Sequence, residues 1–403
     1  MPLPSIPTEQ YFYDLPSEKI AQYPLEQRDS SKLLVLEKDQ CSTKTFTDLP
    51  SLLPKECLIL FNNTKVIPAR ILYQKSTGGI IELFCLEPYL HTPYEALQHK
   101  KKSTWLCMVG GAKKWPNDFL LEWTLPNTEG VKVMAQKKEA IQNTFLIDFF
   151  WEDAQITFGE VLEQLGQIPI PPYLQRKVSA LDGETYQTVF ASQQGSVAAP
   201  TAGLHFTPQV MQQLLEKKHK VYFSTLHVGA GTFKPVTTSF AHEHAMHSEW
   251  VEVDTELIYT LAAPNPVVVV GTTSLRTVES VYWYAVYHQH KNLSDETFVL
   301  PQFFPYTNAS AESKSALLFA LADKLKEQGK SKLVFKTALM IMPGYTMKIA
   351  THLITNFHQP NSTLLMLVDA FTKGRWKMIY SFALENDYRF LSYGDACLLH
   401  YIS

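Results

Sequence analysis

The stretch Val267-Val268-Val269-Val270-Gly271-Thr272-Thr273-Ser274 decides the fold class that the sequence predicts. Four consecutive β-branched residues are typical of a strand that is buried on both faces of a parallel sheet. The next residues continue at helical spacing, with apolar side chains at Leu275, Val278 and Tyr282. A strand that passes through a short turn into a helix is the repeating unit of α/β proteins, so we expect an α/β domain.

Further elements around this unit fit the same class. Residues 208–218 read as a helix, with Thr207 as N-cap and Pro208 at the first position. Strands are predicted at Cys57–Phe61 and Val221–Leu226, and another helix at 311–328. The apolar run Leu364–Val368 is compatible with a buried strand or a buried helix, because periodicity cannot separate the two.

Residues 69–153 follow a different sequence pattern, in which short apolar runs are separated by turn residues. The runs are Arg70–Tyr73, Ile80–Phe84, Trp105–Val109, Phe119–Trp123, Val131–Val133 and Thr144–Ile147. Strands this short and this closely spaced are typical of a small β-barrel. We therefore expect a separate module here.

The overall composition is that of a globular protein. Of the 403 residues, 45% are hydrophobic and 19% are charged, which excludes a disordered acidic chain, a coiled coil and a collagen-like fibre. The formal net charge of -3 does not indicate nucleic-acid binding, although a local basic face stays possible. Lys113 and Lys114 form a local basic cluster, for which a solvated loop and an RNA contact are alternative interpretations.

The cysteines and the apolar runs point to the cytoplasm. The five cysteines are odd in number and form no CxxC pair, which argues against a disulfide framework and a cysteine zinc site. The apolar runs are far shorter than a membrane span, and the first residues do not resemble a signal peptide. We expect a cytoplasmic chain with no membrane partner.

The turn from Gly271 to Ser274 is also a candidate binding element. Free backbone amides at a helix N-terminus, with hydroxyls beside them, can hold a carboxylate, a phosphate or ribose hydroxyls. The turn matches neither a Walker A loop nor GxGxxG, so a capped turn without a ligand is the alternative.

Histidines are concentrated between His242 and His247. An HExxH zinc motif would need its second histidine at the position of Met246, and no cysteine or carboxylate pattern completes another zinc site. We therefore expect no metal, and we interpret histidines near a substrate as acid–base groups. Two further segments, Ser196–Phe206 and Thr225–Phe233, combine small residues with histidine and threonine, which suits a backbone that a ligand approaches closely.

Long sequence blocks through nearly the whole chain are similar to those of a known family. They are Tyr13–Pro16, Ile20–Pro24, Arg28–Leu34, Phe61–Arg70, Gly111–Lys114, Ile168–Tyr173, Tyr186–Ala191, Val197–Thr207, His227–Val236, His244–Glu249, Gly271–Thr277, Pro343–Tyr345, Ile354–His358, Ser362–Val368 and Tyr388–Ala396. In this order they resemble the S-adenosylmethionine:tRNA ribosyltransferase-isomerase family of queuosine biosynthesis. The sequence departs from the family where Gln359 replaces a usual Leu and Asn361 a usual Lys, and in Phe371–Gly374.

The resemblance implies an α/β domain into which a small antiparallel β-barrel domain is inserted. The α/β domain would consist of 1–68 and 154–403, and the barrel of 69–153. The segment 284–336 is longer than the usual family connection and contains its own predicted helix. We expect a monomer.

The resemblance also implies a reaction. The ribosyl group of S-adenosylmethionine would be transferred and isomerised onto 7-aminomethyl-7-deazaguanine at the tRNA wobble position. The products would be epoxyqueuosine in tRNA, adenine and methionine. S-adenosylmethionine would be a cosubstrate, no cofactor would be bound permanently, and the RNA partner would be the anticodon loop.

Site residues follow from the blocks in which they lie. As acid–base groups or carboxylates of the site we expect His205, His227, His358, Asp395 and Glu249. As residues that hold the cosubstrate or a phosphate we expect Thr201, Gly203, Gly229, Thr232, Gly271, Thr272, Thr273, Ser274 and Arg276. As RNA contacts we expect Lys113, Lys114, Arg389 and Tyr393.

Two other classes of function compete with this interpretation. One is a non-catalytic tRNA-binding paralogue, which would not need the histidine, threonine and glycine blocks. The other is a metal-dependent hydrolase that uses the histidine cluster, for which stoichiometric zinc would be the signature.

Overall fold

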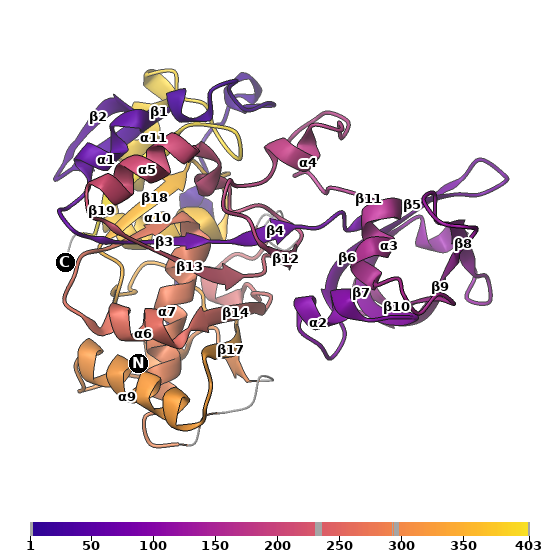
Figure 1. Ribbon diagram of the computed structural model, residues 1–403. Helices are drawn as coiled ribbons and strands as arrows, with labels where there is room; N and C mark the ends of the chain where they lie inside the picture. Colours follow the sequence, from indigo (N-terminus) through magenta and orange to yellow (C-terminus); the bar gives the residue numbers. More distant parts are fainter. Residues whose placement is uncertain (1–2, 230–235, 292, 294–297, 402–403) are drawn as a thin grey trace.

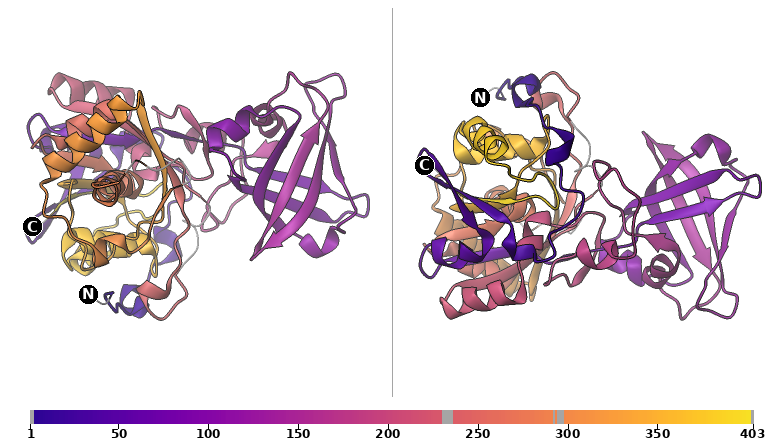
Figure 2. Two further views of the ribbon diagram at one scale, coloured as in Figure 1. Left: turned by 90° about the horizontal axis from the view of Figure 1, so that it is seen from below. Right: turned by 90° about the horizontal axis from the view of Figure 1, so that it is seen from above.

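The computed structural model describes residues 3–229, 236–291, 293 and 298–401, and these form two parts (Figure 1). The larger part is built on a ten-stranded mixed sheet and the smaller part on a seven-stranded antiparallel sheet. In both views of Figure 2 the smaller part projects from one side of the larger one, joined to it by extended segments. The predicted α/β class with a separate β module is therefore confirmed.

The large sheet has the strand order β16-β17-β14-β13-β3-β15-β18-β19-β1-β2. Its strands are β1 (Lys32–Glu37), β2 (Gln40–Thr45), β3 (Leu58–Asn62), β13 (Lys220–Leu226), β14 (Glu249–Asp254), β15 (Val267–Val270), β16 (Val299–Leu300), β17 (Lys332–Thr337), β18 (His352–Asn356) and β19 (Ala396–His400). The four central neighbours β13, β3, β15 and β18 run parallel to one another. Their carboxyl ends therefore meet at one edge of the sheet.

Both faces of the central strands are buried, because successive side chains of β15 enter different cores. Val267 and Val269 pack in the core of α6 (Thr255–Ala262), α7 (Gly271–Tyr287), α9 (Lys314–Glu327), α10 (Thr363–Thr372) and α11 (Trp376–Glu385). Val268 and Val270 pack in the core of α1 (Leu49–Leu52) and α5 (Pro208–Glu216). This double burial explains why the strand is hydrophobic at every position.

Capping side chains fix where several helices begin. The Thr207 hydroxyl accepts from the Val210 amide and starts α5, as the sequence predicts. The apolar run at 364–368, which was compatible with a strand or a helix, belongs to α10, whose start is capped by Ser362 Oγ. The remaining short helices of the large part are α4 (Asp182–Thr185) and α8 (Phe304–Thr307).

The small sheet has the order β11-β5-β6-β7-β10-β9-β8. Its strands are β5 (Arg70–Gln74), β6 (Ile80–Pro88), β7 (Lys102–Gly110), β8 (Leu121–Thr124), β9 (Lys132–Ile141), β10 (Thr144–Trp151) and β11 (Gly166–Gln167). The sheet curls so that the Trp123 indole of β8 donates to the Leu72 carbonyl of β5 at 3.0 Å. The predicted barrel is thus a curled half-barrel, with β8 and β11 at the ends of its pairing order.

Two helices complete the small core: α2 (Pro93–Gln98) and α3 (Phe158–Leu165). Phe158 and Leu162 of α3 are buried among the barrel side chains, and β11 pairs with β5. We propose that the inserted domain runs from 69 to Gln167 and does not end at residue 153. A short parallel pair, β4 (Thr64–Val66) and β12 (Gln193–Ser196), lies where the chain passes between the two parts (Figure 1).

Candidate active site

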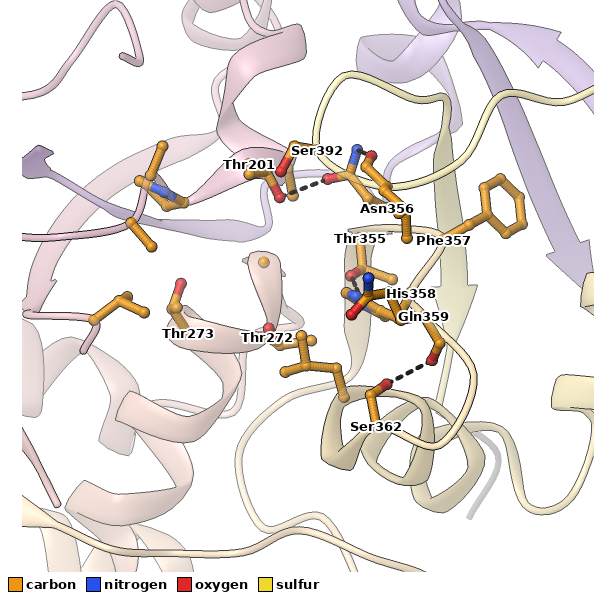
Figure 3. A pocket seen from close by; sticks show the side chains of 18 of the residues that line it. Thr201, Thr272, Thr273, Thr355, Asn356, Phe357, His358, Gln359, Ser362 and Ser392 are labelled. Atoms are coloured by element: carbon orange, nitrogen blue, oxygen red, sulfur yellow. Dashed lines mark hydrogen bonds between the residues drawn. The ribbon is translucent and has the colours of Figure 1, made fainter. Parts of the chain in front are cut away.

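A cleft of about 710 Å³, open solvent included, lies at the carboxyl ends of β15 and β18. Its polar lining includes Thr201, Thr272, Thr273, Thr355, Asn356, His358, Gln359, Ser362 and Ser392 (Figure 3). Because the two strands are parallel neighbours, the residues that follow them converge on the same edge of the sheet. This is the edge at which open α/β sheets bind ligands.

Helix α7 begins at this cleft without a side-chain cap. Its N-cap residue is Val270, and Gly271 has a φ of +88°, a value that favours glycine. Thr272 and Thr273 line the cleft, and the buried Thr273 hydroxyl has no partner among the residues that the structure describes. Unsatisfied amides of a first helical turn, together with free hydroxyls, suit a carboxylate or another oxygen-rich group.

Asn356, the last residue of β18, connects the cleft to a buried histidine. Its Oδ1 accepts from the Thr201 hydroxyl at 3.3 Å, and its Nδ2 lies 3.2 Å from Nε2 of His205 (Figure 3 draws the first bond). An amide nitrogen only donates, so Nε2 accepts and the imidazole proton is on Nδ1, 2.9 Å from the Ser31 hydroxyl. Protein groups therefore occupy both ring nitrogens of His205.

His205 is enclosed away from the cleft itself. Its ring stacks on Phe46 at a centroid distance of 5.0 Å. It lines a smaller pocket with Arg28, Arg389 and Tyr393. Burial, and then the charge of Arg389, lower the pKa of His205 to about 4, so the ring is neutral at physiological pH.

His358 is the predicted histidine whose side chain borders the cleft. Its Nε2 lies 2.9 Å from the Thr355 hydroxyl, and its backbone amide donates to Tyr380. Burial lowers the pKa of His358 to about 4. The imidazole is therefore neutral and can accept a proton from a bound molecule.

A second pocket, of about 590 Å³, holds the predicted residues Glu249 and Arg276. The two side chains form a buried ion pair between β14 and α7. Glu249 Oε1 also accepts from the Gly229 amide at 3.2 Å, and Arg276 Nε donates to the Leu339 carbonyl at 3.1 Å. Glu249 is thus paired and is not a free general base.

A groove of about 1150 Å³ between the two parts holds His227 and Gly229. His227 Nδ1 lies 3.4 Å from the Thr64 hydroxyl, and Nε2 lies 3.7 Å from a carboxylate oxygen of Glu252. The adjacent His227 holds the pKa of Glu252 below its usual range. This histidine–carboxylate pair faces the small part, not the cleft at α7.

Three predicted site residues, the catalytic candidate Asp395 and the binding candidates Gly203 and Ser274, lie outside these cavities. Asp395 accepts from the backbone amides of Lys32 and Arg389 and from the Arg389 guanidinium, so its contacts anchor the start of β1. A Cβ at Gly203 would lie 2.9 Å from Phe190 and Thr188, so close packing explains this glycine. Ser274 is fully buried below the first turn of α7.

The predicted RNA contacts lie in two places. Lys113 and Lys114 are exposed in a short turn of the small part. Arg389 and Tyr393 line the small pocket beside His205, where Tyr393 is buried and Arg389 is partly exposed. Thr232, predicted to bind the cosubstrate, falls outside the described residues.

Several cleft residues escaped the sequence interpretation. Asn356, Thr355 and Ser392 are short polar residues that the sequence reasoning did not single out, although all three lie inside matching blocks. A signal existed in Thr355-Asn356, because two polar residues directly follow the apolar pair Leu353-Ile354 and end the strand at the sheet edge where ligands bind.

Within the described residues, no three histidine, cysteine, aspartate or glutamate side chains come together in a way that could hold a metal ion. None of the helices in these residues is long and apolar enough to cross a membrane.

Comparisons with known proteins match this chain to a sequence family and to solved structures. The crystal structure of an S-adenosylmethionine tRNA ribosyltransferase from Thermotoga maritima is 25% identical, with 96% of this chain and 99% of that chain covered and a TM-score of 0.45. The sequence model of the family described as queuosine biosynthesis protein matches residues 8–399. Since this match spans nearly the whole chain and agrees with the resemblance of the sequence blocks, the protein belongs to the queuosine biosynthesis protein family.

Proposed function

We propose that this protein transfers and isomerises the ribosyl group of S-adenosylmethionine onto 7-aminomethyl-7-deazaguanine at the wobble position of tRNA. The RNA product is epoxyqueuosine-tRNA, and adenine and methionine are released. Membership of the queuosine biosynthesis family over residues 8–399 supports this assignment. The observation that carries it is the placement of neutral His358 opposite the uncapped start of α7 in one cleft.

In this proposal His358 removes a proton from the carbon next to the sulfonium, which the positive sulfur acidifies. If the Thr355 hydroxyl accepts from Nε2, the lone pair of Nδ1 is free for that step. The step turns neutral imidazole into imidazolium, and the proton is then available for a leaving group in the same cleft. A group near adenine has to supply a proton, because adenine leaves more readily when protonated.

The start of α7 would hold the ribosyl part of the cosubstrate. Thr272 and Thr273 present hydroxyls, and the first-turn amides present donors, to the same space. Asn356 would complete this set from β18. We assign His205 a positioning role, because its two ring nitrogens bond to Ser31 and Asn356 and it does not border the cleft.

The groove between the two parts would receive the RNA-borne base. His227, which lies beside Glu252, would keep the aminomethyl group unprotonated so that its nitrogen can attack. The exposed Lys113 and Lys114 would contribute phosphate contacts, and Arg389 and Tyr393 further RNA contacts. A splayed anticodon base can be read on its edges in such a groove.

The experiment is a turnover assay with S-adenosylmethionine and an anticodon stem-loop that carries the aminomethyl-deazaguanine base. Mass spectrometry follows adenine, methionine and the RNA, and a stem-loop with guanine is the control. We expect adenine and methionine to be released together with a heavier RNA, only with the modified base. A methylated RNA would refute the reaction, and tight binding without turnover would favour a tRNA-binding paralogue.

A further inference from the structure

The second pocket carries charges that the reaction at the cleft does not use. It is enclosed by β14, α7, α10 and the segment 339–341, and its lining includes Met246, Glu249, Arg276, Met340, Ile341 and Leu367. The two charged side chains are both at least nine-tenths buried. One positive and one negative group lie side by side, and apolar side chains together with His244, His247 and Thr363 complete the lining.

The guanidinium of Arg276 is incompletely satisfied. Its Nη1 donates to Glu249 and its Nε to the Leu339 carbonyl, whereas Nη2 is buried without a partner among the residues that the structure describes. A buried donor on a charged group is costly to leave unpaired, so its retention in a pocket favours a ligand oxygen. Glu249, with one bond to each oxygen, still has lone pairs that can accept from an ammonium group.

The pocket adjoins the cleft through shared elements. Leu364, in the first turn of α10, lines both cavities. Thr272 of the cleft and Arg276 of the pocket are four residues apart on α7, so they lie on one face of that helix. The two cavities are therefore neighbours, as the two ends of one molecule with a polar head and a nucleoside would require.

We infer that the second pocket binds the amino-acid end of S-adenosylmethionine. The unpartnered Nη2 of Arg276 would take the α-carboxylate, Glu249 the α-ammonium, and the apolar side chains of the pocket the methylene groups of the methionine chain. This assignment rests on the proposed function and adds to it where the cosubstrate's zwitterion lies. It also gives Glu249 a binding role in place of proton transfer.

Equilibrium binding of two nucleosides to the full-length protein tests the assignment. S-adenosylhomocysteine has the amino-acid end, whereas 5′-methylthioadenosine has the same nucleoside without it. We expect the wild type to bind S-adenosylhomocysteine more tightly than 5′-methylthioadenosine. Arg276→Gln should lower the affinity for S-adenosylhomocysteine by about 30-fold or more and leave the affinity for 5′-methylthioadenosine within about 2-fold of the wild-type value. Arg70→Gln is the control, because it breaks an Arg–Glu pair in the small sheet, away from both cavities.

A second variant keeps the test informative if Arg276→Gln fails to fold. The double variant Arg276→Gln with Glu249→Gln removes both charges together and leaves no buried carboxylate unpaired. It should lose the same preference. Equal binding of the two nucleosides by the wild type, or an undiminished preference in the variants, would overturn the pocket assignment alone. A wild type that binds neither nucleoside would overturn the proposed cosubstrate as well.

Discussion

The small part and the large part differ in how completely their buried polar groups are satisfied. In residues 69–167, all of which the structure describes, every buried side-chain nitrogen and oxygen has a hydrogen-bond partner. The buried atoms without one belong, in the described chain, to Asp29, Tyr186, Thr188, His219, Ser224, His227, His242, Trp250, Thr273, Ser274, Arg276, Asn361 and Asp369. Three of these lie in the first two turns of α7.

Two helix starts show the same contrast. Helix α3 of the small part begins with a reciprocal capping box, in which Thr157 accepts from the Glu160 amide and Glu160 accepts from the Thr157 amide. Helix α7 begins with no side-chain cap at all. Complete satisfaction favours stability, whereas open donors and hydroxyls at a cleft favour a ligand. The core of the small part is therefore built for stability, and the α7 edge of the large sheet keeps groups open for a ligand.

The largest effect is expected at His358. The change His358→Gln keeps an amide that can bond Thr355 but removes the group that accepts a proton. We expect turnover of S-adenosylmethionine to fall by about 10²- to 10⁴-fold. The affinity for the stem-loop, measured separately, should stay within about 2-fold of the wild-type value.

His352→Gln is the matched control. His352 is buried in β18, packs next to His400 and does not line the cleft. Near-normal turnover in His358→Gln, or an equal loss in His352→Gln, would remove His358 from the chemistry.

The next largest expected effect is the dependence of the stability of the large part on pH. Burial lowers the pKa of His205, His352 and His358 to about 4, below the value of about 6.5 in an unfolded chain. Between pH 6.5 and 4 the unfolded chain binds protons that the folded chain does not, so the stability of the large part falls as the pH falls through this window. At pH 5 the loss is about 2 kcal/mol for each histidine.

Hydrogen exchange, resolved by segment between pH 7 and pH 5, measures this effect. After correction for intrinsic exchange, the protection of backbone amides should fall more in the large sheet than in the small one. The effect is smaller in the small sheet because His99 there is only partly buried. His352→Gln should remove the share of the loss that His352 contributes, about 2 kcal/mol at pH 5. Equal loss of protection in the two parts would contradict the contrast between them.

Local signals in the sequence predict much of this fold and less of its site. Val267–Val270 and the turn after it identify β15 and α7, because β-branched runs and helical spacing are local properties. The pairing of Glu249 with Arg276 joins residues 27 positions apart and depends on how β14 packs on α7. Likewise the sequence marks His205 as a candidate but cannot tell that Ser31 and Asn356 occupy both its nitrogens.

A smaller effect is expected at the start of α7. Thr273→Val removes a buried hydroxyl without a partner among the described residues, so the free energy of unfolding should stay unchanged or rise by up to about 1 kcal/mol. Affinity for S-adenosylhomocysteine should fall about 10-fold if that hydroxyl binds the ribosyl group. Ser280→Ala on the same helix is the control: it breaks a 2.8 Å bond to Thr337, so it should destabilise without changing affinity. A destabilised Thr273→Val with normal affinity would assign this hydroxyl to the fold.

The smallest effect should come from the capping box of the small part. Thr157→Ala leaves the Glu160 amide without its acceptor, and we expect the free energy of unfolding of the small part to fall by about 1 kcal/mol. Turnover per folded molecule should not change, because Thr157 borders none of the described cavities. Denaturant unfolding followed by tryptophan fluorescence, together with the turnover assay, measures both quantities. If turnover fell with stability intact, the position of α3 would contribute to catalysis, and the assignment of this capping box to stability alone would be wrong.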